Sequence, residues 1–284
     1  MNDNKTIAST LVWATNYLCA VSETPRLDAE LLLMYVLGWS RVKVIAEQKA
    51  TLSTAQVAAL RPLIERRAQR ESIAYIVGYK EFYGMDFMVN SSVLVPRPET
   101  ELLVDLAIQH AHRVQQPLHI ADIGTGSGCI AVTLAAQLSE VDVYAVDISS
   151  DALKVAAKNV ARHKVIAKVH LIEGDLVAPL KTPVDMIVSN PPYTILSEID
   201  AGVLEHEPHL ALDGGVDGFA VYRQLLADAP SKLGPDGMVL LEIGATQGAE
   251  VMALAHAHFP SAQITLHQDL AGHDRVVRIQ RNTR

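Results

Sequence analysis

The chain has 284 residues, of which 49% are apolar and 20% are charged, a balance that indicates a globular protein with a large buried core. It has no uninterrupted apolar run of about eighteen residues and no basic-then-apolar N-terminus, so neither a membrane span nor a secretory signal is expected. Its two cysteines, Cys19 and Cys129, are too few for a disulfide framework or a metal cluster, and we expect a cytoplasmic protein without a metal site.

The net charge of −8 is unevenly distributed, with +3 over residues 1–80 and −11 over residues 81–284. An acidic surface repels a phosphate backbone, so this charge argues against stable nucleic-acid binding. A basic cluster in the N-terminal part either touches RNA or an acidic protein or, more often, is an ordinary solvated helix face. The cluster consists of Arg61, Arg66, Arg67 and Arg70.

Residues 1–72 are predicted to be helical throughout and to form a small bundle. One apolar-rich helix covers residues 27–37 and ends at Gly38, a typical C-cap residue. Another opens at Ser53, where Gln56 stands at the position of a capping box.

From Ile73 onward, aromatic and polar residues alternate around glycines, which predicts a β-hairpin linker over residues 73–95. The run from Pro96 to Glu101 then starts a helix, with proline and acidic residues in its first turn. Arg97 and Glu99 in this run have two interpretations, because they either begin the helix or lie beside a ligand.

Residues 96–284 alternate between apolar strands and helices, which predicts a mostly parallel, Rossmann-like sheet with helices on both faces. No helix separates the last two strands, so these are predicted to pair antiparallel. The predicted strands are 118–123, 141–146, 169–172, 185–189, 238–243, 263–267 and 275–280. The predicted helices after the first strand are 129–138, 150–163, 221–229 and 248–258.

A glycine-rich turn, Asp122-Ile123-Gly124-Thr125-Gly126-Ser127-Gly128, follows the first of these strands. It leaves no side chain to block a ligand from the amides of the next helix. The spacing Gly-x-Gly-x-Gly differs from the dinucleotide fingerprint, which favours a nucleoside cofactor over NAD. The residues predicted here to bind the cofactor are Asp122, Gly124, Thr125, Gly126 and Gly128.

Acidic residues end the second and third strands, at the sheet edge where open α/β folds bind ligands. Asp147 can accept hydrogen bonds from two ribose hydroxyls, although it is alternatively a cap for the helix that starts near Ser150. Asp175 is a candidate acceptor for an adenine amino group, with Leu176 covering the ring. A simple Gly-Asp turn is the alternative at this second position.

The fourth strand ends in Asn190-Pro191-Pro192-Tyr193. The prolines fix the backbone and remove two donors, so the carbonyls of Asn190 and Pro191 are free of any sheet ladder. With the Asn190 side-chain oxygen as a second acceptor and the Tyr193 ring as a wall, the motif predicts a pocket for a planar NH2 group. A proline turn that caps the strand is the alternative. We assign Asn190, Pro191 and Tyr193 to catalysis, the whole motif with Pro192 to substrate binding, and Asn190 also to the cofactor.

Together, the glycine turn, Asp147, Gly174-Asp175 and Asn190-Pro191-Pro192-Tyr193 resemble the motifs of S-adenosylmethionine-dependent methyltransferases that methylate amino nitrogens. Four further segments, 81–84, 95–101, 212–218 and 269–275, are similar to those of the peptide chain release factor N5-glutamine methyltransferases (the HemK/PrmC family). This resemblance covers nearly the whole chain. It implies a seven-stranded methyltransferase sheet with an antiparallel last strand and S-adenosylmethionine as the cofactor.

The same resemblance implies, as substrate, the glutamine of the Gly-Gly-Gln motif in class I release factors. It implies that residues 1–72 recognise the release factor, that 73–95 form the linker, and that 96–284 form the catalytic domain. Because DNA methyltransferases share the Asn-Pro-Pro-Tyr motif, a nucleic-acid base is an alternative acceptor. A ribosomal-protein glutamine, the substrate of a sister family, is another. A nicotinamide oxidoreductase and a non-catalytic binding module are further alternatives, disfavoured by the glycine spacing and by the complete motif.

Overall fold

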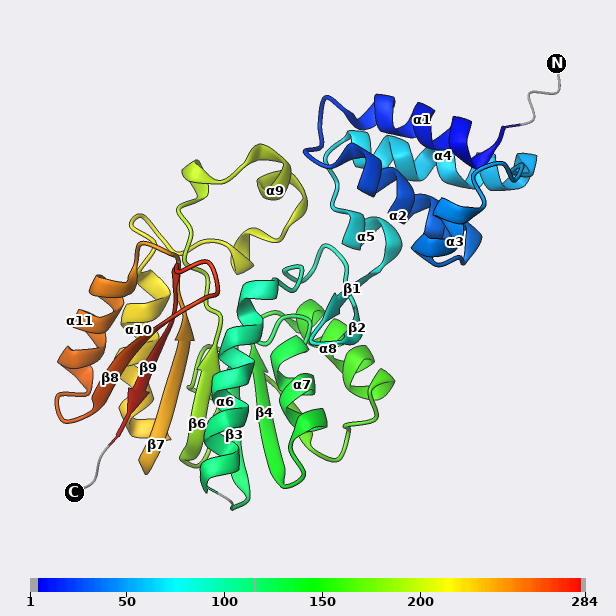
Figure 1. Cartoon of the computed structure of the whole chain (residues 1–284). Helices are drawn as coiled ribbons and strands as arrows, with labels where there is room; N and C mark the ends of the chain where they lie inside the picture. Colours follow the sequence, from blue (N-terminus) through cyan, green and yellow to red (C-terminus); the bar gives the residue numbers. More distant parts are fainter. Residues whose placement is uncertain (1–4, 115, 282–284) are drawn as a thin grey trace. The chain divides into compact units, whose positions relative to one another are not determined.

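The computed structural model describes residues 5–114 and 116–281, which form two compact units (Figure 1). The helical unit contains the described residues up to Tyr79 together with Asp200–His206. The sheet unit contains Lys80–Ile199 and the described residues from Glu207 onward. Within the described residues, no helix is both long and apolar enough to cross a bilayer.

The helical unit is a bundle around a single apolar core. Ile7, Leu11, Leu32, Leu60 and Ile64 are all at most 1% exposed within this core. The predicted caps are confirmed, because Gly38 ends its helix in the left-handed conformation and Ser53 forms a capping box with Gln56. The helices are α1 (Ile7–Leu18), α2 (Pro25–Leu37), α3 (Arg41–Ala46), α4 (Thr54–Ala68), α5 (Ile73–Val77) and α9 (Ala201–His206).

The hairpin starts later than the sequence predicts, because residues 73–77 form the short helix α5. The Ser72 side chain accepts a hydrogen bond from the Tyr75 backbone N–H, and Gly78 closes the helix in the left-handed conformation. The hairpin itself is formed by β1 (Tyr79–Phe82) and β2 (Met85–Met88). The predicted linker over residues 73–95 is thereby divided between the two units.

The segment Asp200–His206 is far from the other helices of its unit in the sequence, yet it packs with the end of α4. The His206 Nε2 atom lies 2.8 Å from the Gln69 carbonyl oxygen, and the Arg70 guanidinium lies 3.7 Å from the Asp200 carboxylate. The helical unit is therefore built from two stretches of chain, whereas the sequence predicts one continuous domain over residues 1–72.

Within the described residues, the sheet unit contains a sheet of seven strands in the order β5-β4-β3-β6-β7-β9-β8. The prediction of an antiparallel last strand is confirmed, because β9 runs antiparallel to both of its neighbours. The remaining pairs are parallel, with Asp122 opposite Ala145 and Ser189 opposite Leu241. The strands are β3 (Leu118–Ile123), β4 (Val141–Asp147), β5 (Val169–Glu173), β6 (Val184–Ser189), β7 (Leu233–Glu242), β8 (Gln263–Gln268) and β9 (Asp274–Gln280).

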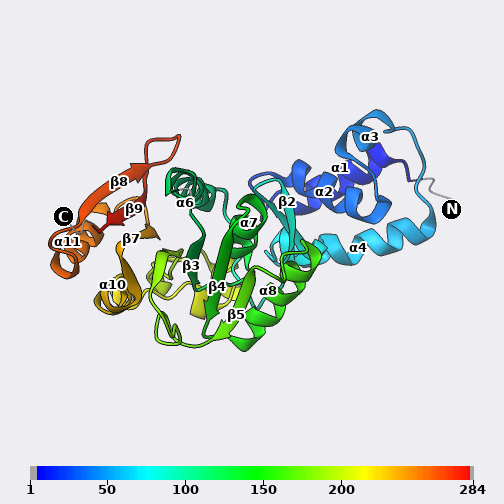
Figure 2. The same ribbon diagram turned by 90° about the horizontal axis from the view of Figure 1, so that it is seen from below.

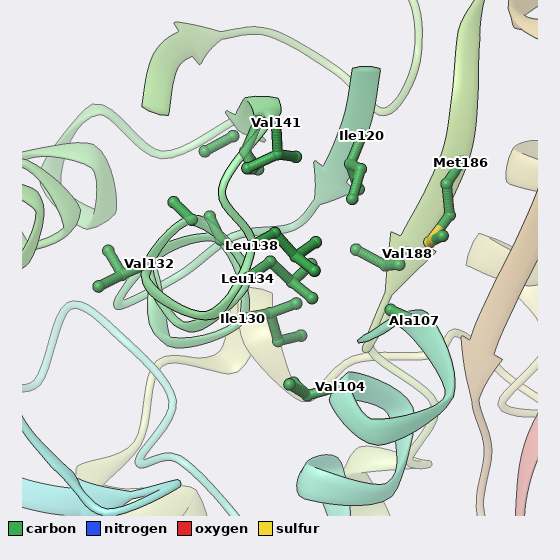
Figure 3. Close-up of a cluster of buried hydrophobic side chains, with 14 of the residues drawn as sticks. Val104, Ala107, Ile120, Ile130, Val132, Leu134, Leu138, Val141, Met186 and Val188 are labelled. Carbon is green, nitrogen blue, oxygen red and sulfur yellow. The ribbon is translucent and has the colours of Figure 1, made fainter. Parts of the chain in front are cut away.

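Helices cover both faces of this sheet (Figure 2). Side chains alternate along each strand, so Ile120 joins the core under α6 and α7, whereas Ala121 joins the core under α10 and α11. Figure 3 shows the first of these cores, where Ile130 and Leu134 of α7 lie near Val188 of β6. The helices are α6 (Glu101–Val114), α7 (Cys129–Gln137), α8 (Ser150–Arg162), α10 (Ala220–Lys232) and α11 (Gly248–His258), with short 3-10 turns at Pro98–Thr100, Leu196–Glu198 and His209–Ala211.

Candidate active site

A cavity of about 490 Å³ lies in the sheet unit at the carboxyl ends of β3, β4, β5 and β6. Its volume is in the range of small-molecule sites. The predicted residues on its wall are Gly124, Thr125, Gly126, Asp147, Asp175, Leu176, Asn190 and Pro192. The predicted residues outside its wall are Asp122, Gly128, Pro191 and Tyr193. Four separate strand ends thus contribute to one hollow, as the sequence predicts.

The glycine turn is held from behind by the buried carboxylate of Asp122, which is 0% exposed. One carboxylate oxygen, Oδ2, accepts hydrogen bonds from the Thr125 hydroxyl at 2.7 Å and the Ala131 backbone N–H at 3.1 Å. Burial raises the pKa of Asp122 to about 7, and the bond from Thr125 opposes this rise. Asp122 therefore shapes the turn and the first turn of α7, and does not touch the cavity.

Gly128 also supports the turn from behind. It is buried, with a φ of +79°, and a Cβ atom there would lie 3.2 Å from the Ala156 Cβ of α8. Beside it, the side-chain amide of Asn159 donates to the Ser127 carbonyl at 2.8 Å and to the Met88 carbonyl at 2.9 Å. Asn159 therefore links the glycine turn to the hairpin. No local sequence signal predicts this role.

Asp147 lies on the cavity wall at the end of β4. Its Oδ2 accepts the Gly126 backbone N–H at 2.8 Å, and its Oδ1 accepts the Ser149 backbone N–H at 2.9 Å. The cap of α8 is the side chain of Ser149, which accepts from the Ala152 backbone N–H, so the capping alternative for Asp147 is wrong. Burial raises the pKa of Asp147, and these backbone hydrogen bonds oppose the rise.

Asp175 and Leu176 lie on the cavity wall just beyond β5. The Asp175 carboxylate is exposed and accepts a hydrogen bond from the Gln224 side chain at 3.2 Å. Leu176 has a φ of +44°, a left-handed conformation that is costly for a branched side chain. Backbone strain of this kind is concentrated at functional sites, and Leu176 adopts it where it lines the cavity.

Asn190 contributes to the wall directly after β6. Its side-chain N–H donates to the Thr100 hydroxyl oxygen at 3.2 Å, so the Asn190 amide is oriented with its nitrogen toward Thr100. Pro192 lies on the same wall. Pro191 is buried, and among the described residues no hydrogen bond to its carbonyl oxygen is found.

Tyr193 lies beside the cavity instead of on its wall. Its ring packs at the edge of the core under α10 and α11, and the residue lines a neighbouring hollow together with Thr194 and Phe219. Burial and the nearby Glu242 carboxylate raise the pKa of the Tyr193 phenol to about 12, so the ring is neutral near neutral pH.

A glycine-rich segment, residues 212–218, clamps the backbone that leaves the Asn-Pro-Pro-Tyr motif. The Thr194 backbone N–H donates to the Leu212 carbonyl at 3.1 Å, and the Gly214 backbone N–H donates to the Thr194 carbonyl at 2.8 Å. Gly214 must be glycine, because a Cβ there would lie 2.8 Å from both Tyr193 Cα and the Tyr193 carbonyl carbon. The close packing of Gly214 on the Tyr193 backbone explains why a glycine-rich segment occurs together with the Asn-Pro-Pro-Tyr motif.

Arg97 lies on the cavity wall, and its guanidinium pairs with the buried Glu207 carboxylate at 2.7 Å. This pair anchors the segment that carries Leu210 and Asp213, two further wall residues, beside the 3-10 turn at Pro98–Thr100. Within the described residues, no group of three or more histidine, cysteine, aspartate or glutamate side chains is arranged to hold a metal ion.

The fold and this site define a Rossmann-like methyltransferase. Residues 9–78 match the family model described as the PrmC N-terminal domain, and residues 99–206 match the methyltransferase small domain. The chain is 41% identical over 277 residues to a release factor glutamine methyltransferase of Geobacter sulfurreducens, covering 96% of this chain and 95% of that protein. It is 40% identical to the protein of that name from Moorella thermoacetica, covering 89% of this chain and 90% of that protein.

The structural comparison agrees on the fold. The Thermus thermophilus 16S rRNA N2 G1207 methyltransferase in complex with AdoMet and guanosine aligns with a TM-score of 0.52 at 16% identity, over 72% of this chain and 50% of that chain. The extent and level of the sequence identity assign the particular family: the chain belongs to the release factor glutamine methyltransferases.

Proposed function

We propose that this protein transfers a methyl group from S-adenosylmethionine to the side-chain amide nitrogen of a glutamine, and that this glutamine lies in the Gly-Gly-Gln motif of class I release factors. One observation carries the proposal: a single cavity is lined both by the glycine turn with Asp147 and by Asn190. The printed names of the relatives, which specify release factor and glutamine, support the choice of substrate.

The residues of the cavity fit S-adenosylmethionine. A Cβ atom on Gly124 would meet no atom within 4 Å, so the backbone of the turn faces open space that a ligand can fill. Asp147, Asp175 and Leu176 line the cavity. We assign the Asp147 carboxylate to the ribose hydroxyls, Asp175 to the adenine amino group and Leu176 to the adenine ring. When bound, the cofactor supplies a methyl group on a positively charged sulfonium.

Asn190 and Pro191 are assigned to the acceptor glutamine. With its N–H engaged by Thr100, the Asn190 side chain keeps its Oδ1 available for one amide hydrogen of the substrate. Pro191 is itself outside the wall, but it lies between the wall residues Asn190 and Pro192, and no hydrogen bond to its carbonyl oxygen is found among the described residues. Its carbonyl is therefore assigned to the other hydrogen, and the prolines fix its direction. Two acceptors at fixed positions hold the substrate nitrogen and favour its pyramidal geometry, which frees the lone pair for the methyl group. The Tyr193 ring is assigned to exclude water beside this pocket.

Positioning supplies much of the rate in this proposal. Holding two reactants in line contributes up to about 7–11 kcal/mol toward lowering the barrier. A glutamine amide is a weak nucleophile because its lone pair is delocalised into the carbonyl, so alignment matters more than prior removal of a proton. With the cofactor bound, the N–CH3 bond would form as the S–CH3 bond breaks, which would leave the neutral thioether of the cofactor. The nitrogen would then lose one proton to water.

The helical unit is assigned to recognition of the release factor, and the reaction is assigned to the cytoplasm. Labelled methyl transfer tests the whole proposal. The protein is incubated with S-adenosylmethionine and, in separate reactions, with a purified release factor, ribosomal proteins or DNA. Label is expected in the release factor alone. Label in DNA or a ribosomal protein, with none in the release factor, contradicts the proposed substrate.

A further inference from the structure

A glutamine side chain holds the far end of the Asn-Pro-Pro-Tyr motif, and the proposed function does not yet use it. Gln247 directly precedes α11, and its Nε2 atom donates to the Tyr193 carbonyl at 3.1 Å and to the Gly218 carbonyl at 3.3 Å. Its Oε1 atom accepts the Gly244 backbone N–H at 3.0 Å. One side chain therefore links the end of the motif to two other segments of the sheet unit.

The three backbone partners fix the orientation of the Gln247 amide. A backbone N–H can only donate, and a backbone carbonyl can only accept. The amide oxygen must therefore face Gly244, while the amide nitrogen must face Tyr193 and Gly218. None of these partners is a hydroxyl or a titrating group, so the direction of each hydrogen bond is settled by the geometry.

Two glycines leave the space that the Gln247 amide occupies. A Cβ atom on Gly218 would lie 2.9 Å from Gln247 Nε2 and 2.7 Å from the Tyr193 carbonyl oxygen. A Cβ atom on Gly244 would lie 3.0 Å from Gln247 Oε1. All three distances are shorter than the 3.4 Å at which ordinary contact begins, so a side chain at either glycine would displace the amide. The surroundings are thus shaped for this glutamine.

The backbone of the Asn-Pro-Pro-Tyr motif is held from its two ends. At the near end, Ser189 belongs to β6, and its hydroxyl donates to the Ile123 carbonyl at 2.7 Å. The two prolines that follow have no N–H with which to anchor the middle of the motif. At the far end, the Tyr193 carbonyl accepts a hydrogen bond from Gln247 alone among the described residues. The direction of the Pro191 carbonyl therefore depends on Gln247 as well as on β6.

We propose that Gln247 is a positioning residue for methyl transfer, which acts through the Tyr193 carbonyl to hold the Asn-Pro-Pro-Tyr motif in the geometry that receives the acceptor amide. The inference rests on the proposed function and extends it to a residue outside the motif. Gln247 does not line the cavity, so it is assigned no contact with the substrate or the cofactor.

Two variants of Gln247 and one matched control test this role. Gln247→Met removes the amide at similar length, and Gln247→Asn keeps the amide but is one methylene too short to bridge Gly244 and Tyr193. Gln280→Met is the control, because the Gln280 side chain donates to the Asp236 carbonyl at 2.8 Å, toward the amino end of β7 and away from the motif.

The measurements separate positioning from stability. They are kcat and KM with a purified release factor at saturating S-adenosylmethionine, the Kd of that cofactor by calorimetry, and the free energy of unfolding in urea. A role in stability alone would lower the free energy of unfolding in the variants at both positions and would leave kcat of the folded proteins unchanged.

Gln247→Met and Gln247→Asn are each expected to lower kcat about tenfold, as a small misplacement of the reacting groups does. The KM for the release factor and the cofactor Kd are expected to stay within about twofold, because the helical unit, the glycine turn and Asp147 are untouched. Gln280→Met is expected to keep the wild-type kcat, although it loses a hydrogen bond of the same kind.

Wild-type kcat in folded Gln247→Met overturns the positioning role, and so does an equal loss of kcat in Gln280→Met. A loss that appears in KM or in the cofactor Kd, with kcat unchanged, also overturns it. Should Gln247→Met fail to fold, Gln247→Asn decides alone, and wild-type kcat in that variant refutes the inference. A wild-type protein that does not methylate the release factor instead contradicts the proposed function itself, so the two failures are distinguishable.

Discussion

The clamp behind the Asn-Pro-Pro-Tyr motif predicts that a single methyl group at position 214 slows methyl transfer. In Gly214→Ala, the new Cβ would lie 2.8 Å from Tyr193 Cα, from the Tyr193 carbonyl carbon and from Gly218 Cα. All three neighbours are backbone atoms, so no side chain can turn away to relieve the clash. Gly214 is not in the left-handed region, so the effect of the substitution is steric and not conformational.

The size of the effect follows from the overlap. The 2.8 Å contacts are 0.6 Å shorter than the 3.4 Å at which ordinary contact begins, so the backbone around Tyr193 must move by about that distance. Since a misplacement of about 1 Å costs about a hundredfold in rate, we expect kcat to fall by about tenfold. The cofactor Kd is expected to change by less than about twofold, because the glycine turn and Asp147 lie on other strands.

The assay is methyl transfer to a purified release factor, combined with calorimetric titration of S-adenosylmethionine. Gly234→Ala is the matched control, because its Cβ would meet only the Val184 carbonyl oxygen at 3.4 Å and its backbone is not left-handed. Wild-type kcat in Gly214→Ala refutes the clamp. An equal loss of kcat in Gly234→Ala also refutes it, since any glycine replaced in this unit would then have the same effect.

Two further changes probe the cofactor side. Asp147→Asn is expected to weaken S-adenosylmethionine binding by about tenfold, because one charge-assisted hydrogen bond is lost. Calorimetry measures the Kd, and Asp142→Asn at the other end of β4 is the control. Equal losses of affinity in both variants argue against a ribose contact. Asp122→Asn is expected to alter how stability depends on pH. With its pKa raised to about 7, the Asp122 carboxyl favours folding when protonated, and this contribution is lost as the pH rises through 7. Between about pH 5 and about pH 8, the free energy of unfolding in urea should therefore fall by about 3 kcal/mol more in the wild type than in the variant. Parallel pH dependence of the two proteins counts against the assignment.

The sheet and its helices were predictable because each element has its own local signal. The strand over Leu118–Ile123 and the helix over Gly248–His258 coincide with the predicted ranges. Apolar periodicity and caps such as Ser53 with Gln56 act within a few residues, so the sequence alone specifies them.

The short helix over Ile73–Val77 escaped prediction although its signals are present. Ser72 and Gly78 bracket it as N-cap and left-handed C-cap, but the aromatic alternation around them favoured strands. Asp200–His206 belongs to the helical unit through contacts with Gln69 and Arg70, more than a hundred residues away. Contacts at such separation leave no trace in one sequence.

The candidate site shows the same division between local and distant signals. Motif spacing identified the strand ends that meet at the cavity, but it did not separate wall residues from residues behind the wall, such as Asp122 and Gly128. The residues that hold the motifs in place, Asn159 and Thr100, lie on other elements and carry no motif of their own.

Asn190 is proposed to hold a glutamine amide nitrogen for methyl transfer. Tandem mass spectrometry of a release factor, incubated with S-adenosylmethionine and either wild-type protein or Asn190→Ala, tests it most directly. We predict a mass increase of one CH2 unit on the glutamine side chain of the Gly-Gly-Gln peptide with the wild type, and none with Asn190→Ala although that variant still binds the cofactor. Methylation at any other residue, or full methylation by Asn190→Ala, contradicts the account.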